Sequence, residues 1–202
     1  MLVPKGSSSG MLEIKRSKFF YCAEGIMSHE DAKRIVLETR SRHPQANHVV
    51  YAYVLGLQGD IFGMSDDHEP KHTAGRPALE VVKGSGITNV LVVIVRYFGG
   101  IQLGTGGLVK AYGDAARNAL AALPAEQYIS REHIQITVGY SLYEQTALLL
   151  SEYGAVDIHE TFLTNILITA RVPCKQSELL KSKLQDLSSG GIKFSLLPDN
   201  ED

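Results

Sequence analysis

The chain has 202 residues, of which 44% are hydrophobic and 21% are charged, and its formal net charge is −2. This length fits one large or two small domains with an ordinary hydrophobic core. Residues 1–130 carry 14 basic and 12 acidic side chains, whereas residues 131–202 carry 6 and 10. That asymmetry is too small to predict non-specific nucleic-acid binding. Two distant cysteines and the absence of an 18-residue apolar run predict a cytoplasmic protein without disulfides or membrane association.

The first half of the chain predicts a mixture of helices and strands. Residues 1–10 include the tag-like letters LVPKGS, so we expect a tag remnant or a disordered segment there and begin the fold at residue 11. Ser28 precedes an amphipathic stretch, which predicts a capped helix from about His29 to His43. Two β-branched and aromatic runs, 48–55 and 61–64, flank a Gln-Gly-Asp turn and predict a β-hairpin.

A polar loop over residues 65–76 follows the hairpin. Pro77 favours the first turn of a helix that runs to Lys83, where a Gly-Ser-Gly sequence ends it. The continuous apolar run 90–95 predicts a strand buried on both faces. Helical spacing of small and apolar residues resumes at Leu108 and continues to Leu123.

The pattern after residue 130 predicts a second domain. Its elements follow the order β-α-β-β-α-β, with strands at 133–139, 156–162, 165–172 and 192–197 and helices at 142–153 and 175–187. This order is typical of a ferredoxin-like unit, and about seventy residues is a normal size for one. The sequence therefore predicts an α+β protein with domains at 11–130 and 131–202.

A glycine-dense turn between the buried strand and the long helix is the first candidate site. Glycine permits a positive φ and lets a ligand approach the backbone closely. The free amides and positive dipole end of the following helix favour an anion such as phosphate or carboxylate. The spacing matches neither a dinucleotide-binding nor a P-loop motif. The candidate anion-binding residues are Arg96, Gly99, Gly100, Gly104, Thr105, Gly106, Gly107 and Lys110.

The acidic loop is the second candidate site. Asp66, Asp67 and Glu69 put three carboxylates within four residues, a density that suits Mg²⁺ or general acid and base chemistry. Thr73 is a candidate nucleophile if a base lies nearby. The alternative is a polar turn in which these side chains bond to the local backbone. We expect no cofactor, with Mg²⁺ as the only alternative.

Three segments, SDDHEPKHTAGRP, VVIVRYFGG and LGTGGLVKAY, resemble the signature of the IMPACT family. The chain departs from the family's usual pattern at His68 and His72, where glycine is common. The resemblance implies an N-terminal domain similar to an α+β fold of elongation factor G and a small-subunit ribosomal protein. It also implies a C-terminal domain similar to the last domain of that factor. Similar eukaryotic proteins restrain a translation-initiation kinase by competing for its activator, so the resemblance implies a link to translation.

Two functional hypotheses follow. The first is a non-catalytic cytoplasmic protein, linked to translation, whose glycine turn binds RNA, the ribosome or an acidic partner protein. The second is a small metal-assisted hydrolase or phosphate-ester enzyme that uses the acidic loop. The sequence leaves the oligomeric state open.

Overall fold

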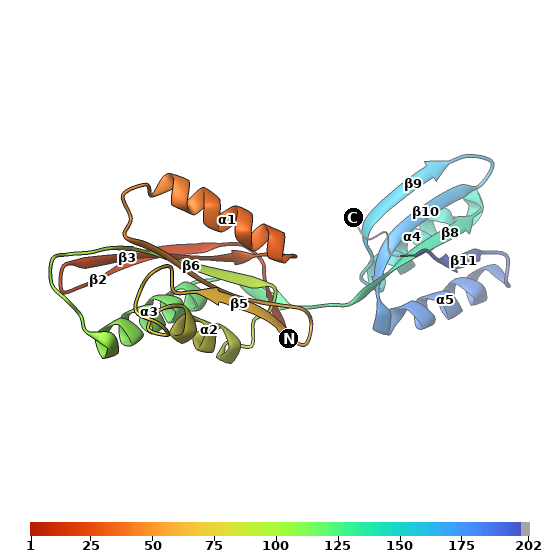
Figure 1. Ribbon diagram of the computed structural model, residues 1–202. Helices are drawn as coiled ribbons and strands as arrows, with labels where there is room; N and C mark the ends of the chain where they lie inside the picture. The colour runs from red at the N-terminus through yellow and green to blue at the C-terminus, as the bar shows by residue number, and fades with distance from the viewer. Residues whose placement is uncertain (199–202) are drawn as a thin grey trace. The chain divides into compact units, whose positions relative to one another are not determined.

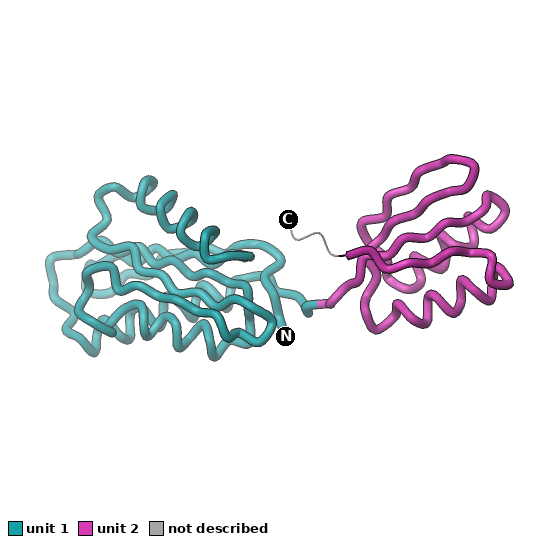
Figure 2. The backbone as a smooth tube through the Cα atoms, turned by 45° about the vertical axis from the view of Figure 1, so that its right-hand side comes forward, with its two compact units in different colours: residues 1–128 teal, residues 129–202 magenta. Residues whose placement is uncertain are grey.

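The computed structural model describes residues 1–198. The chain divides into two compact units, the first over Met1–Tyr128 and the second beginning at Ile129 (Figure 2). The chain is a mixed α+β protein, as the sequence predicts. No helix in the described part of the chain is long and apolar enough to cross a membrane.

The first unit is built on a five-stranded sheet in the order β2-β3-β6-β4-β5, with all neighbouring strands antiparallel. One helix, α1, covers one face of the sheet, and α2 and α3 lie side by side on the other face (Figure 1). The strands are β2 (Ser8–Ile14), β3 (Ser17–Gly25), β4 (His48–Leu55), β5 (Ile61–Ser65) and β6 (Val90–Tyr97), and the helices are α1 (His29–Arg42), α2 (Gly75–Gly84) and α3 (Thr105–Ala121).

The exclusion of residues 1–10 from the fold is wrong. Strand β1 (Leu2–Pro4) pairs with β7 (Ala125–Gln127), and β2 begins at Ser8. The Ser8 side chain is buried and donates a hydrogen bond from Oγ to the carbonyl of Ala119, at 2.6 Å. The sequence did not reveal these strands, because β1 is short, β2 opens with small polar residues, and the letters LVPKGS resemble a tag.

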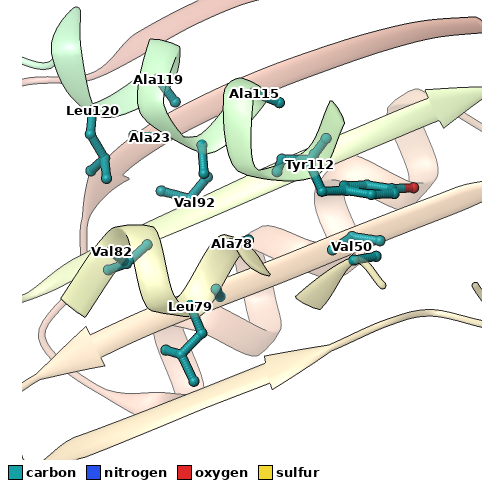
Figure 3. Close-up of a cluster of buried hydrophobic side chains, with 14 of the residues drawn as sticks. Ala23, Val50, Ala78, Leu79, Val82, Val92, Tyr112, Ala115, Ala119 and Leu120 are labelled. Carbon is teal, nitrogen blue, oxygen red and sulfur yellow. The ribbon is translucent and has the colours of Figure 1, made fainter. Parts of the chain in front are cut away.

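Strand β6 lies at the centre of the sheet, and its residues from Val90 to Val95 are all buried. The prediction of a strand covered on both faces is therefore confirmed. Val92 faces α2 and α3, where Ala115 and Ala119 of α3 pack close to the sheet (Figure 3). Because alanine adds little bulk, the helix axis approaches the strands closely.

The helices match their predicted positions, although two of them begin earlier. Ser28 caps α1, as the sequence predicts, and the structure shows that Ser28 and Asp31 form a reciprocal capping box. We expected α2 to begin at Pro77 and α3 at Leu108, yet they begin at Gly75 and Thr105. Apolar periodicity cannot reveal the first turn of α3, because Thr105 and Gly106 there are exposed.

The second unit shows the predicted order β-α-β-β-α-β. Its sheet has the antiparallel order β11-β8-β10-β9, and its apolar core lies between this sheet and the helices. The likeness to a ferredoxin-like domain and to domains of an elongation factor stays a prediction. The elements are β8 (Arg131–Val138), a 3₁₀ turn (Tyr140–Leu142), α4 (Tyr143–Glu152), β9 (Val156–Phe162), β10 (Ile166–Pro173), α5 (Cys174–Ser188) and β11 (Lys193–Leu196).

Candidate anion-binding site

A pocket of about 350 Å³ lies where the end of β6, the acidic loop and the start of α3 meet. Arg96 and Phe98 form part of its wall, Glu69 comes from the acidic loop, and Gln102 and Thr105 come from the glycine-rich turn. Both candidate sites of the sequence thus contribute to one pocket. Arg96 lies in β6, and Phe98 follows Tyr97, the last residue of that strand.

A buried ion pair forms the inner wall of this pocket. Nη1 of Arg96 donates to Oε1 of Glu69 at 2.6 Å, and the two side chains are only 7% and 3% exposed. The hydroxyl of Tyr112, which points out of the apolar cluster in Figure 3, donates to the same oxygen at 2.6 Å. Burial and then the bond to Glu69 raise the pKa of Tyr112 far above its usual value. Tyr112 therefore remains a neutral donor.

Arg96 has one donor that the protein does not use. Its Nη2 lies 3.5 Å from Oγ of Ser17, whereas its Nε is buried and has no acceptor among the described residues. Buried donors are almost always bonded, so the acceptor for Nε must come from water or from a ligand.

His48 approaches the ion pair from β4. Its Nδ1 lies 2.7 Å from the carbonyl oxygen of Asp67, and since a carbonyl only accepts, Nδ1 carries a proton. Nε2 lies 3.7 Å from Oε1 of Glu69.

Asp66 and Asp67 have structural partners. Oδ1 of Asp66 accepts from the amides of Ala74 and Gly75, at 3.1 and 2.7 Å, so this carboxylate satisfies the N-terminus of α2. The carboxylate of Asp67 accepts from Arg40 and from the amide of Val49. Both aspartates hold the acidic loop against the sheet and the helices.

The three carboxylates of the acidic loop point to separate partners. Asp66, Asp67 and Glu69 each bond to different groups, and residues 1–198 contain no cluster of three or more His, Cys, Asp or Glu side chains suited to a metal. Thr73 is buried and donates from Oγ1 to the carbonyl of Pro70 at 2.6 Å. The polar-turn alternative therefore describes Thr73 and the two aspartates better than a catalytic role does.

At the glycine-rich turn, the first backbone amides of α3 have no hydrogen-bond acceptor among the described residues. Gly104 has φ 75° and ψ 165°, a combination that only glycine adopts readily. Its carbonyl accepts the amide of Leu108 at 3.0 Å. The amides of Thr105, Gly106 and Gly107 have no acceptor among residues 1–198. The neighbouring helix α2, in contrast, has the carboxylate of Asp66 at its N-terminus.

Individual glycines in the turn have different roles. A Cβ on Gly99 would lie 2.0 Å from the carbonyl carbon of Arg16, and the Gly99 amide already donates to Oγ of Ser17 at 3.2 Å. Gly99 therefore allows the chain after β6 to pack closely against the backbone of Arg16 and Ser17. A Cβ on Gly106 would meet no atom within 4 Å, and the backbone there is not left-handed. The fold does not require glycine at position 106, although glycine costs a helix roughly 1 kcal/mol relative to alanine.

Lys110 does not join Arg96. It is exposed and lines a separate groove between α2 and α3, together with Arg76 and Arg117. The sequence grouped Lys110 with Arg96 because both lie near the glycines, but the helix turns Lys110 away. Gly100 is exposed and has φ 82°.

Three residues of the site were given no binding role from the sequence. Ser17 and His48 lie far from the glycines in the chain, and only the pairing of β3 and β4 with β6 brings them close. Tyr112 was expected to serve packing alone. It does pack edge-to-face on Phe19, at 5.3 Å between ring centroids, but its hydroxyl also completes the ion pair. No spacing signal in the sequence reveals these contacts.

The backbone is left-handed at His68 and His72, the two positions where the chain departs from the usual glycine of the family. His68 and His72 have φ values of 67° and 66°, in the left-handed region that favours glycine. A family that usually has glycine at these positions fits the same backbone without strain. In this chain both histidines are exposed.

Comparison with known proteins gives a consistent result. The family model of the Impact N-terminal domain matches residues 15–120. An IMPACT family member of Haemophilus influenzae is 35% identical over 202 residues, which cover 99% of this chain and 98% of that protein. The IMPACT family member YigZ of Escherichia coli is 34% identical over 195 residues, with 96% of each chain covered. A crystal structure described as that of a hypothetical protein has a TM-score of 0.69, 32% identity and 98% coverage of both chains. The resemblance seen in the sequence is confirmed, and the chain belongs to the IMPACT family.

Proposed function

We propose that this chain is a non-catalytic binding protein, linked to translation, that holds an anionic group at the N-terminus of α3. The contrast between two neighbouring helices carries this proposal. The chain supplies a carboxylate to the first amides of α2 but nothing to those of α3. An anion at α3 would play the part that Asp66 plays at α2.

The pocket beside α3 supports this interpretation. Arg96 and Glu69 neutralise each other, so the attraction comes mainly from the amide dipoles of Thr105 to Gly107 and from the unused Nε of Arg96. Oriented donors of this kind bind anions without a large net charge. The near-neutral composition of the chain is compatible with such a local site.

The link to translation follows from family membership rather than from the pocket. Eukaryotic proteins similar to this family restrain a translation-initiation kinase, a role that requires binding and no chemistry. The corresponding partner here is RNA, the ribosome or an acidic protein surface, in the cytoplasm. A metal-assisted hydrolase is less well supported, because Asp66, Asp67 and Thr73 are all engaged in structural bonds.

Gly106→Ala tests the anion site directly. Alanine should stabilise α3 by about 0.5–1 kcal/mol, yet its Cβ would narrow the approach to the free amides. We expect phosphate to cause saturable ¹⁵N-HSQC shifts at residues 105–107 of the wild-type chain, and Gly106→Ala to weaken this binding several-fold.

Gly113→Ala is the matched control. It makes the same change further along α3, where a Cβ would be 3.5 Å from the Arg117 guanidinium, an ordinary contact. Chloride at equal ionic strength controls for screening. If the amides of residues 105–107 respond equally to chloride and phosphate, or if Gly106→Ala binds phosphate like the wild type, there is no anion site at α3.

A further inference from the structure

An exposed aromatic ring lies beside the anion donors. Phe98 is 48% exposed, and its ring forms part of the pocket wall. Its backbone amide donates to Oδ1 of Asn47 at 2.8 Å, and its ring centroid is 5.6 Å from the Arg96 guanidinium carbon. A half-exposed ring offers a flat surface on which a base can stack.

The pocket is larger than a phosphate group needs. Its volume of about 350 Å³ lies within the range of roughly 300–1,000 Å³ that is usual for organic ligands. Beyond the amide end, Leu103 and Leu108 contribute apolar surface and Gln102 contributes an amide that can donate and accept. The wall thus combines anion donors, an aromatic face and a neutral polar group.

We propose that this pocket binds a nucleotide, with its phosphate on the amides of Thr105 to Gly107 and its base against Phe98. This inference rests on the proposed function and adds the ligand class. Arg96, whose buried Nε has no acceptor among the described residues, lines the same pocket and so adds a cationic side chain to its wall. The same chemistry is offered by a free mononucleotide and by the 5′-terminal nucleotide of an RNA strand.

Binding of four probes to the full-length chain tests the ligand class: inorganic phosphate, adenosine, AMP and a phosphoserine peptide. Stacking on an aromatic ring strengthens binding by about 5- to 150-fold. We expect AMP to bind more tightly than phosphate by a factor in this range, and both adenosine and the peptide to bind more weakly than AMP.

The variant Phe98→Leu separates the two parts of the site. It should reduce AMP affinity to near that of phosphate and leave phosphate affinity unchanged. Phe62→Leu is the matched control, because Phe62 is 49% exposed and does not line the pocket. A 5′-phosphorylated hexa-adenylate and its unphosphorylated form distinguish the sources: tighter binding of the phosphorylated strand than of AMP assigns the site to RNA ends, and the reverse order assigns it to free nucleotides.

The failures of the two proposals are distinguishable. If phosphate binds at residues 105–107 but AMP binds no more tightly, the nucleotide inference is wrong and the anion site stands. Tighter binding of the phosphoserine peptide than of AMP overturns the inference in favour of a protein partner. Absence of binding by every probe overturns both proposals.

Discussion

Removal of one member of the buried ion pair should destabilise the first unit strongly. Arg96→Met would leave the Glu69 carboxylate, which is 3% exposed, with the Tyr112 hydroxyl as its close donor. Breaking a buried pair in this way costs about 3–5 kcal/mol, because a charge stays buried without compensation. Glu69→Met should cost a similar amount by stranding the Arg96 guanidinium.

The double variant should be far less damaging than the sum of the two single variants. With both charges gone, the main remaining cost is the unsatisfied Tyr112 hydroxyl, at about 1–3 kcal/mol. The interaction energy between the two sites should therefore exceed about 2 kcal/mol. Arg34→Met is a matched control, since the Arg34 side chain is 59% exposed and its ion pairs lie on the surface of α1. Its effect should stay within about 0.5 kcal/mol.

Native-state hydrogen exchange measured by mass spectrometry suits a chain with two units. Peptides from β6 report the stability of the first unit, and peptides from β10 provide an internal reference in the second. A loss of 3 kcal/mol corresponds to about 150-fold faster exchange of the most protected β6 amides. Additive effects in the double variant, or a single variant no worse than Arg34→Met, would refute the argument that the two charges depend on each other.

Three further predictions concern other parts of the chain. His72→Gly should relieve the left-handed backbone and raise the urea midpoint slightly, whereas His72→Val should cost about 1–2 kcal/mol; equal effects of both would contradict the assigned φ. The hydrogen bond from the Met27 amide lowers the pKa of Asp31. The ionised Asp31 therefore stabilises the folded state at a pH above its unfolded pKa of about 3.9, and this stabilisation is lost as the pH falls through the folded pKa. Asp31→Asn should therefore lower the melting temperature at pH 7, and the difference from the wild type should shrink as the pH is lowered below the unfolded pKa; a constant difference would show that charge plays no part. Burial raises the pKa of the Cys22 thiol above 9.0, so iodoacetamide should alkylate Cys22 more slowly than free cysteine at pH 8, and an equal rate would mean that this thiol is accessible and ionised normally.

The elements that sequence patterns revealed are those whose burial is periodic. The strand from Val90 to Val95, the capping box at Ser28 and the helix rich in alanine all carry a local signal that survives folding. Strand β2 was missed, because it begins with Ser-Ser-Gly, which carries no apolar signal. Strand β3 was missed as well, because its pairing with β6 is not encoded in the local sequence.

The candidate site shows the same division. The glycine turn and the acidic loop were found because unusual residue types are concentrated there. Their contacts were not, since the bond from Arg96 to Glu69 spans 27 residues and the approach of Ser17 to Arg96 spans 79. The sequence therefore identified residues that supply donors to the pocket, but the pairing of the strands in the sheet determines which of them face one another.

The short pairing of β1 with β7 has a practical consequence for work with this protein. Met1 and Lys5 hold Tyr128 and Pro124 through backbone bonds of 3.0 and 2.8 Å, immediately before the second unit begins. Trimming the first seven residues would remove the partners of the Pro124 carbonyl and the Tyr128 amide. The Tyr128 amide should therefore exchange its hydrogen faster in the truncated protein, while the amides of β10 keep their protection.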